Sequence, residues 1–147
     1  RRLLQGVVAG LILFGATLLA GFVMRGLGVE SDQLQSFRAT RAGTTAQIAG
    51  FVLAAVALAP MVEEAFFRGY VFSALQGRYG RPIAYMGSAA LFAFVHADLK
   101  AAPSLIVVGL LLAFVFDRTG SIVPTIVAHA FNNAIVASVI LAVPAAR

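Results

Sequence analysis

The sequence has no cysteine and no tryptophan, and only 12% of its residues are charged. The lack of cysteine excludes disulfide bonds and thiolate metal sites. The scarcity of charge says more about the fold. Hydrophobic residues make up 61% of the chain, and the 14 glycines bring the apolar share to roughly 70%, whereas a soluble domain has about 45–50%. A soluble fold of 147 residues would lack the polar side chains to cover its surface, so a lipid bilayer is the expected solvent.

Acidic residues are also few, six against eleven basic ones, which gives a net charge of +5. Such an excess can indicate nucleic-acid binding, but the arrangement here does not support it. Ten of the eleven basic residues are arginines that stand singly or in pairs, mostly at the ends of apolar runs. They form no basic face with interleaved aromatic rings. We therefore expect contacts with anionic lipid headgroups and no nucleic-acid partner.

Five apolar runs predict an all-α, polytopic transmembrane bundle that forms a single domain over residues 1–147. A run of about 20 residues at 1.5 Å per residue spans a hydrocarbon core of ~30 Å. A polar stretch from Gly26 to Thr45, predicted to be a loop or an interfacial helix, separates the first two runs. The runs are Leu3 to Met24, Ala46 to Gln76, Pro82 to Ala97, Pro103 to Phe116 and Ser121 to Val143.

The second run is longer than a bilayer requires, so it should tilt, protrude or be broken. Pro60 is the natural break, because proline lacks an N–H group and its ring clashes with the preceding helical turn. The sequence thus predicts one helix to about Ala59 and another from about Pro60. The chain begins with Arg1 rather than methionine, which suggests a domain of a longer protein.

The residues that a membrane helix should avoid are the informative ones. An ionisable side chain at the bilayer centre costs about 2.5–3.5 kcal/mol on insertion scales, so each one suggests a function. Two adjacent glutamates, Glu63 and Glu64, lie in the second run, followed by Arg68. Each of the two histidines also lies in an apolar run, His96 in the third and His129 in the fifth.

Helix geometry separates the two glutamates. Glu64 precedes Arg68 by four residues, which predicts an intrahelical ion pair. Glu63 lies ~100° away around the helix and is predicted to face a different neighbour, with no local cation. A carboxyl group without a partner in an apolar site is suited to proton transfer near neutral pH. The alternative is that both glutamates belong to one structural network with Arg68.

The fifth run places His129 and Asn133 four residues apart, so their side chains share one helix face. Asn132 points ~100° away and is expected to bond to a neighbouring helix. In the third run, Phe92 precedes His96 by four residues, so its ring should pack beside that imidazole. The alternative for each histidine is a satisfied core residue.

Three motifs in this order resemble a known family. Residues 63–68 fit Glu-Glu-x-x-x-Arg, residues 92–96 fit Phe-x-x-x-His, and residues 129–133 fit His-x-x-x-Asn. Together they resemble the CAAX protease and bacteriocin-processing (CPBP, or Abi) family of intramembrane peptidases, which includes the type II CAAX prenyl proteases. The resemblance covers residues 60–133, about half of the chain.

The resemblance implies an endopeptidase of a membrane, expected to be a bacterial cell membrane. Its substrates would be membrane-associated, prenylated (CAAX-type) or leader-bearing peptides. Glu63 would act as the base, with His96, on a water molecule, and His129 and Asn133 would stabilise the oxyanion. Glu64 and Arg68 would have supporting roles.

Metal dependence is open at the level of sequence. Glu63, His96 and His129 also form a ligand set typical of catalytic zinc sites. If Glu63 were a ligand, the sequence would offer no separate base, so the metal-free mechanism is favoured. Other functions also fit intramembrane Glu and His residues: a proton-coupled transporter or channel, or an inactive immunity or scaffold protein of the same fold.

Overall fold

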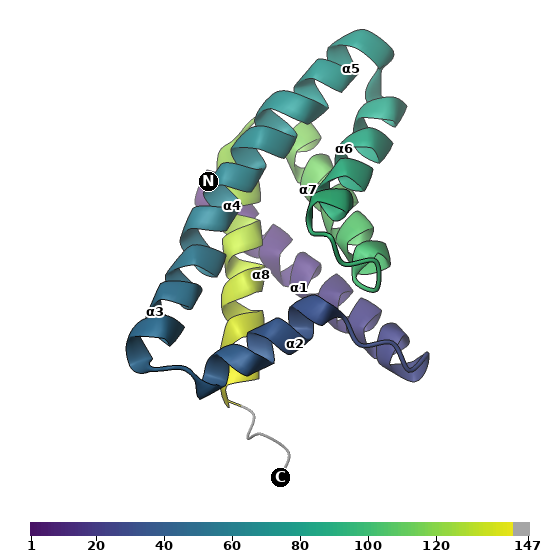
Figure 1. Ribbon diagram of the computed structural model, residues 1–147. Coiled ribbons are helices and arrows are strands. Elements are labelled where there is room, and N and C mark those ends of the chain that lie inside the picture. The colour runs from purple at the N-terminus through teal and green to yellow at the C-terminus, as the bar shows by residue number, and fades with distance from the viewer. Residues whose placement is uncertain (143–147) are drawn as a thin grey trace.

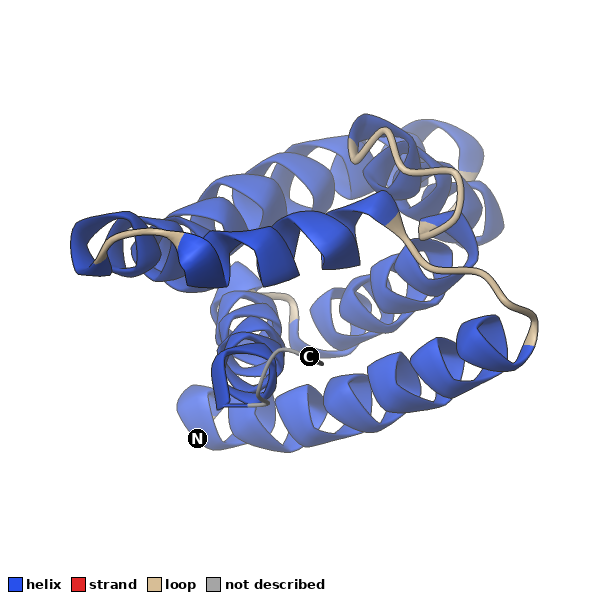
Figure 2. Ribbon diagram, turned by 60° about the horizontal axis from the view of Figure 1, so that its bottom comes forward, coloured by secondary structure: helices blue, strands red, loops and turns tan. Residues whose placement is uncertain are grey.

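The computed structural model describes residues 1–142, with the backbone alone for Gln33, Leu34 and Phe37. These residues form helices joined by short loops, with no strand among them (Figures 1 and 2). This confirms the predicted all-α bundle. The elements are α1 (Arg2–Gly26), α2 (Asp32–Ala39), η1 (Thr40–Ala42), α3 (Thr45–Leu53), η2 (Ala54–Leu58), α4 (Ala59–Glu64), η3 (Ala65–Phe72), α5 (Ser73–Tyr79), α6 (Arg81–Val95), α7 (Ala102–Thr119) and α8 (Ile122–Ala142).

Four helical segments are long and apolar enough to cross a membrane, and α6 is a shorter apolar helix. The four are Arg2–Gly26, Thr45–Tyr79, Ala102–Thr119 and Ile122–Ala142. They correspond to the first, second, fourth and fifth predicted runs, and α6 to the third. Val143, the predicted end of the fifth run, lies outside the described residues. The chain is an integral membrane protein.

The predicted break at Pro60 is wrong. Residues Thr45–Tyr79 form one helical segment of 35 residues, drawn as the long diagonal helix of Figure 1. The helix widens instead of breaking: η2, just before Pro60, and η3, after Glu64, are both π-helical. A π-turn shifts the backbone hydrogen bonds from i−4 to i−5. The wider turn relieves the clash between the proline ring and the preceding backbone, so Pro60 is accommodated within a continuous helix.

Local signals set the ends of the helices. At the start of α3, Thr44 forms a capping box with Gln47: its backbone N–H donates to Oε1 of Gln47 (2.8 Å), while its hydroxyl accepts from the backbone N–H of Gln47. Gly80, with φ +82°, separates α5 from α6, and Gly120, with φ +60°, ends α7. Both glycines adopt positive φ, which glycine tolerates best.

Helix α1 packs mainly on α8, which it crosses in Figure 1. The contact depends on a Gly-x-x-x-Gly pattern, the small-residue motif that lets membrane helices approach closely. A Cβ atom on Gly6 would lie 2.5 Å from Cβ of Val127, and one on Gly10 would lie 2.9 Å from the ring of Phe131. This close approach brings the later part of α1 against the polar residues of α8.

Gly6→Ala is therefore expected to destabilise the α1–α8 contact by about 1–3 kcal/mol, the usual cost of overpacking a tight site. Thermal unfolding in detergent measures the loss. Gly15→Ala is the matched control on the same helix, because nothing lies within 4 Å of its added Cβ. Equal unfolding temperatures for the two variants would contradict this account of the packing.

Candidate active site

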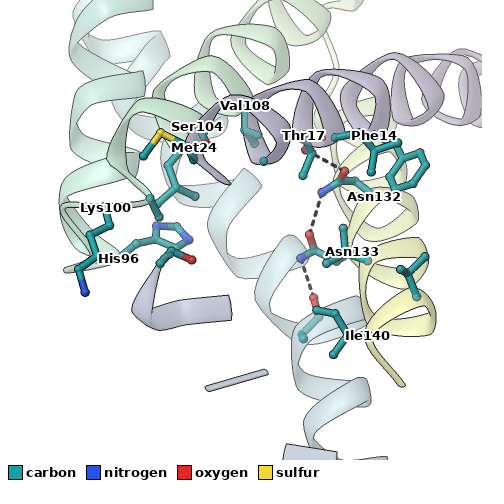
Figure 3. A pocket seen from close by; sticks show the side chains of 18 of the residues that line it. Phe14, Thr17, Met24, His96, Lys100, Ser104, Val108, Asn132, Asn133 and Ile140 are labelled. Atoms are coloured by element: carbon teal, nitrogen blue, oxygen red, sulfur yellow. Dashed lines mark hydrogen bonds between the residues drawn. The ribbon is translucent and has the colours of Figure 1, made fainter. Parts of the chain in front are cut away.

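A cavity of about 1100 Å³ lies between α1, the continuous helix Thr45–Tyr79 (called the long helix from here on), α7 and α8 (Figure 3). All four residues predicted to form the site line it: Glu63, His96, His129 and Asn133. Three separate segments of the chain thus contribute to one cavity. Most of the remaining residues that line the cavity are apolar, so these four polar side chains lie in a mostly apolar cavity.

His129 contacts both glutamates. Its Nδ1 lies 2.9 Å from Oε1 of Glu64, and its Nε2 lies 3.8 Å from Oε2 of Glu63. The prediction that the two carboxyl groups face different neighbours is thus wrong. The imidazole of His129 has two nitrogens on different sides of its ring. It can therefore contact both glutamates, although their side chains leave the long helix in directions that differ by ~100°. Oε2 of Glu63 is buried and has no hydrogen-bond partner among the described residues.

The predicted ion pair between Glu64 and Arg68 is confirmed. Nη1 of Arg68 lies 2.9 Å from Oε1 of Glu64, and both side chains are fully buried. Nη2 of Arg68 donates to the carbonyl of Gly109 (3.0 Å) on α7, and the guanidinium stacks over the ring of Phe92, 4.9 Å from its centroid. Arg68 thereby fixes the Glu64 carboxylate, which in turn accepts from His129.

His96 ends α6, and its ring is held by its own helix. Its Nδ1 lies 2.7 Å from the carbonyl oxygen of Phe92. A carbonyl only accepts, so Nδ1 carries the hydrogen, and in the neutral ring Nε2 is left as an acceptor. The ring of Phe92 lies 4.7 Å from that of His96 and 5.9 Å from that of His129, centroid to centroid. The predicted packing of Phe92 beside His96 is confirmed, and the phenyl ring contacts the second imidazole as well.

Sequence reasoning missed Thr17 as a residue of the site. Its hydroxyl donates to Oδ1 of Asn132 (3.2 Å), which confirms the expected bond from Asn132 to a neighbouring helix. Asn132 donates in turn to Oδ1 of Asn133 (3.2 Å), and Asn133 donates to the backbone carbonyl of Ala55 (2.9 Å; Figure 3). The signal in the sequence that could have identified Thr17 is its hydroxyl, which stands in an otherwise apolar stretch of α1.

Charged groups from α1, the α1–α2 loop, α2 and the α6–α7 loop also line the cavity: Arg25, Glu30, Arg38 and Lys100. Arg38 pairs with Glu30, and Nζ of Lys100 lies 2.7 Å from Oδ1 of Asp32. The hydrogen bond to Asp32 raises the pKa of Lys100, so this link between α2 and the loop persists at neutral pH. Arg25 stands in the last turn of α1, and the other three residues that line the cavity lie outside the apolar helices.

The alternative zinc set, Glu63, His96 and His129, is not assembled. Among the residues with described positions, no three His, Asp or Glu side chains come close enough together to hold one metal ion. Glu63 and His129 are neighbours, whereas the His96 ring is held on the carbonyl of Phe92. The donors as placed do not fit a three-ligand zinc site.

Comparison with known proteins shows the family to which the chain belongs. The family described as "Type II CAAX prenyl endopeptidase Rce1-like" matches residues 45–135. The chain is also 30% identical over 111 residues to the Bacillus subtilis (strain 168) protein named "Putative membrane peptidase YdiL", an alignment that covers 76% of this chain and 44% of that protein. The chain thus spans less than half the length of this relative. No solved structure matches it. The matched segment contains Glu63, Glu64, Arg68, His96, His129 and Asn133, and the chain belongs to the Rce1-like family of type II CAAX prenyl endopeptidases.

Proposed function

We propose that this chain is an intramembrane endopeptidase that cleaves membrane-associated peptides with a water molecule activated by Glu63. The observation that supports it most is the Glu63 carboxylate. One of its oxygens has no hydrogen bond among the described residues and lies 3.8 Å from Nε2 of His129. Glu63 also lines the same cavity as His96 and Asn133. The proposed base and the proposed donors thus line the same cavity, which would also receive the peptide. Prenylated CAAX-type C-termini and leader-bearing peptides are the proposed substrate classes.

Glu63 and His96 would prepare the attacking water. Because Nδ1 of His96 donates to Phe92, its Nε2 is free to accept one hydrogen of that water. Glu63 takes the other proton, and the resulting hydroxide attacks the carbonyl carbon of the scissile peptide bond. The proton held by Glu63 then passes to the leaving nitrogen as the C–N bond breaks, which yields a carboxylic acid and an amine.

His129 and Asn133 would stabilise the oxyanion. Nδ1 of His129 is directed at the Glu64 carboxylate, so the ring presents Nε2 to the cavity. When Nε2 also carries a proton, it is a donor for the developing negative charge, and Glu64 compensates the charge of the ring. Asn133 adds an amide N–H from one helical turn further along α8. Each donor of this kind typically contributes a factor of about 10²–10³.

A mechanism with Glu63 as base requires no metal, because the carboxylate itself takes the proton. We therefore expect purified protein to retain at least about half of its activity after incubation with a strong chelator such as 1,10-phenanthroline. Elemental analysis of the same sample is expected to find well under one zinc per chain. Loss of activity on chelation, with recovery on addition of zinc, would contradict this expectation.

Cleavage of defined peptides tests the proposed function. Protein in detergent is incubated with a prenylated CAAX peptide, its unprenylated form and a panel of leader peptides, and mass spectrometry locates any cut. Glu63→Ala, purified in parallel, corrects for contaminating proteases. Cuts made by the parent alone support the proposal. Proton flux into liposomes without any cleavage would instead favour the transporter or channel.

A further inference from the structure

A relay of hydrogen bonds crosses the cavity wall from α1 to the long helix. It runs from the Thr17 hydroxyl to Oδ1 of Asn132, from Nδ2 of Asn132 to Oδ1 of Asn133, and from Nδ2 of Asn133 to the carbonyl of Ala55 (Figure 3). All four residues line the cavity. We call these three hydrogen bonds the relay.

Pro60 explains why the last acceptor is available. At the end of η2 the N–H of Ala59 bonds to the carbonyl of Ala54, five residues back. In that register the carbonyl of Ala55 would pair with the N–H of residue 60, but proline has none. An unpaired backbone carbonyl among apolar helices is costly. The Asn133 carboxamide supplies the missing donor.

The relay also fixes which way the Asn133 carboxamide points. A carboxamide has one oxygen acceptor and two N–H donors. The oxygen accepts from Asn132, and one N–H donates to Ala55. The second N–H has no further partner among the described residues. Flipping the amide would set its oxygen against the carbonyl of Ala55 and its nitrogen against the donor of Asn132.

Thr17 supplies the donor at the α1 end of the relay, whose direction is fixed at the other end because the carbonyl of Ala55 can only accept. A threonine inside a helix commonly bonds to the carbonyl of its own preceding turn, but here the hydroxyl donates to Oδ1 of Asn132. That bond places the amide nitrogen of Asn132 toward Asn133. Thr17 lies on α1, outside the segment 45–135 that matches the family, so α1 adds a polar group to the site.

We propose that Thr17 is a positioning residue: through Asn132 it holds the Asn133 carboxamide in the orientation in which its second N–H faces the peptide carbonyl. This rests on the proposed function, in which Asn133 stabilises the oxyanion. The bonds formed and broken in hydrolysis are unchanged, and Thr17 itself touches no reacting atom. Its loss should therefore affect turnover more than substrate binding.

Two substitutions separate the hydroxyl of Thr17 from its packing. Thr17→Val keeps the shape and removes the donor, while Thr17→Ser keeps the donor. We expect Thr17→Val to lower kcat about 5- to 20-fold with KM within about twofold, and Thr17→Ser to stay within about twofold of the parent. Ser138→Ala is the control, because Ser138 lies on α8 with Asn132 and Asn133, but its hydroxyl bonds only to the carbonyl of Ala134 among the described residues. Parental kcat in Thr17→Val, or an equal loss in Thr17→Ser, would overturn the proposal.

Nuclear magnetic resonance tests the relay without reference to activity. The chain has two asparagines, Asn132 and Asn133, so protein labelled with ¹⁵N-asparagine in micelles shows two side-chain amide groups. We expect Thr17→Val to shift the signals of both, and Ser138→Ala to shift neither. An unmoved Asn133 signal would refute the relay. If the relay signals respond but the parent cleaves no peptide, it is the proposed function that fails.

Discussion

Glu63→Gln is expected to lower kcat by about 10²–10⁴-fold, the contribution typical of a general base. Glutamine has the shape of glutamate but cannot take a proton from water. Oε2 of Glu63 makes no hydrogen bond among the described groups, and Nε2 of His129 lies 3.8 Å from it. The substitution therefore breaks no hydrogen bond from this oxygen, and the unfolding temperature should stay close to that of the parent.

Asp117→Asn is the matched control for Glu63→Gln, because it makes the same carboxyl-to-carboxamide change away from the cavity. Asp117 accepts from Gln76 and Tyr85 (3.1 Å each) near the C-terminal end of α7. Activity is measured per folded molecule, with the peptide that the parent cleaves. If Glu63→Gln loses no more activity than Asp117→Asn, Glu63 is not the general base of the reaction.

Much of the site follows from helical spacing alone. The four-residue separations predict the pair of Glu64 with Arg68 and the shared face of His129 and Asn133, and the structure contains both. Spacing could not predict the contact of His129 with both glutamates. That contact depends on how deeply α8 inserts its ring beside the long helix, which is a property of packing between segments about 65 residues apart.

The fold, like the site, could be predicted from the sequence only in part. Apolar runs predict where the helices lie, but the rule that proline breaks a helix fails at Pro60, because the preceding π-turn shifts the hydrogen-bond register. Sequence reasoning missed Gly6 and Gly10, although their four-residue spacing is a known signal for helix packing. The partner helix could not have been predicted, because the choice of α8 is made by the tertiary contacts of Val127 and Phe131.

Arg68→Met is expected to destabilise the protein by about 3–5 kcal/mol, the usual cost of removing one partner from a buried ion pair. The Glu64 carboxylate is fully buried and would lose its only cationic partner apart from His129 among the described residues. Methionine fills a similar volume, so the loss reports mainly on the uncompensated charge of Glu64. Unfolding in detergent, followed by circular dichroism, measures it.

The double variant Glu64→Gln/Arg68→Met separates stability from catalysis. Neutralising Glu64 removes the uncompensated charge, so much of the lost stability should return, since replacing both partners of a buried pair is often nearly neutral. Activity should not return with it. The glutamine oxygen can still accept from Nδ1 of His129, but it no longer offsets the positive ring that would stabilise the oxyanion, so kcat should remain at least about 10-fold below that of the parent. A double variant with both parental stability and parental kcat would show that Glu64 only neutralises Arg68 and has no influence on His129.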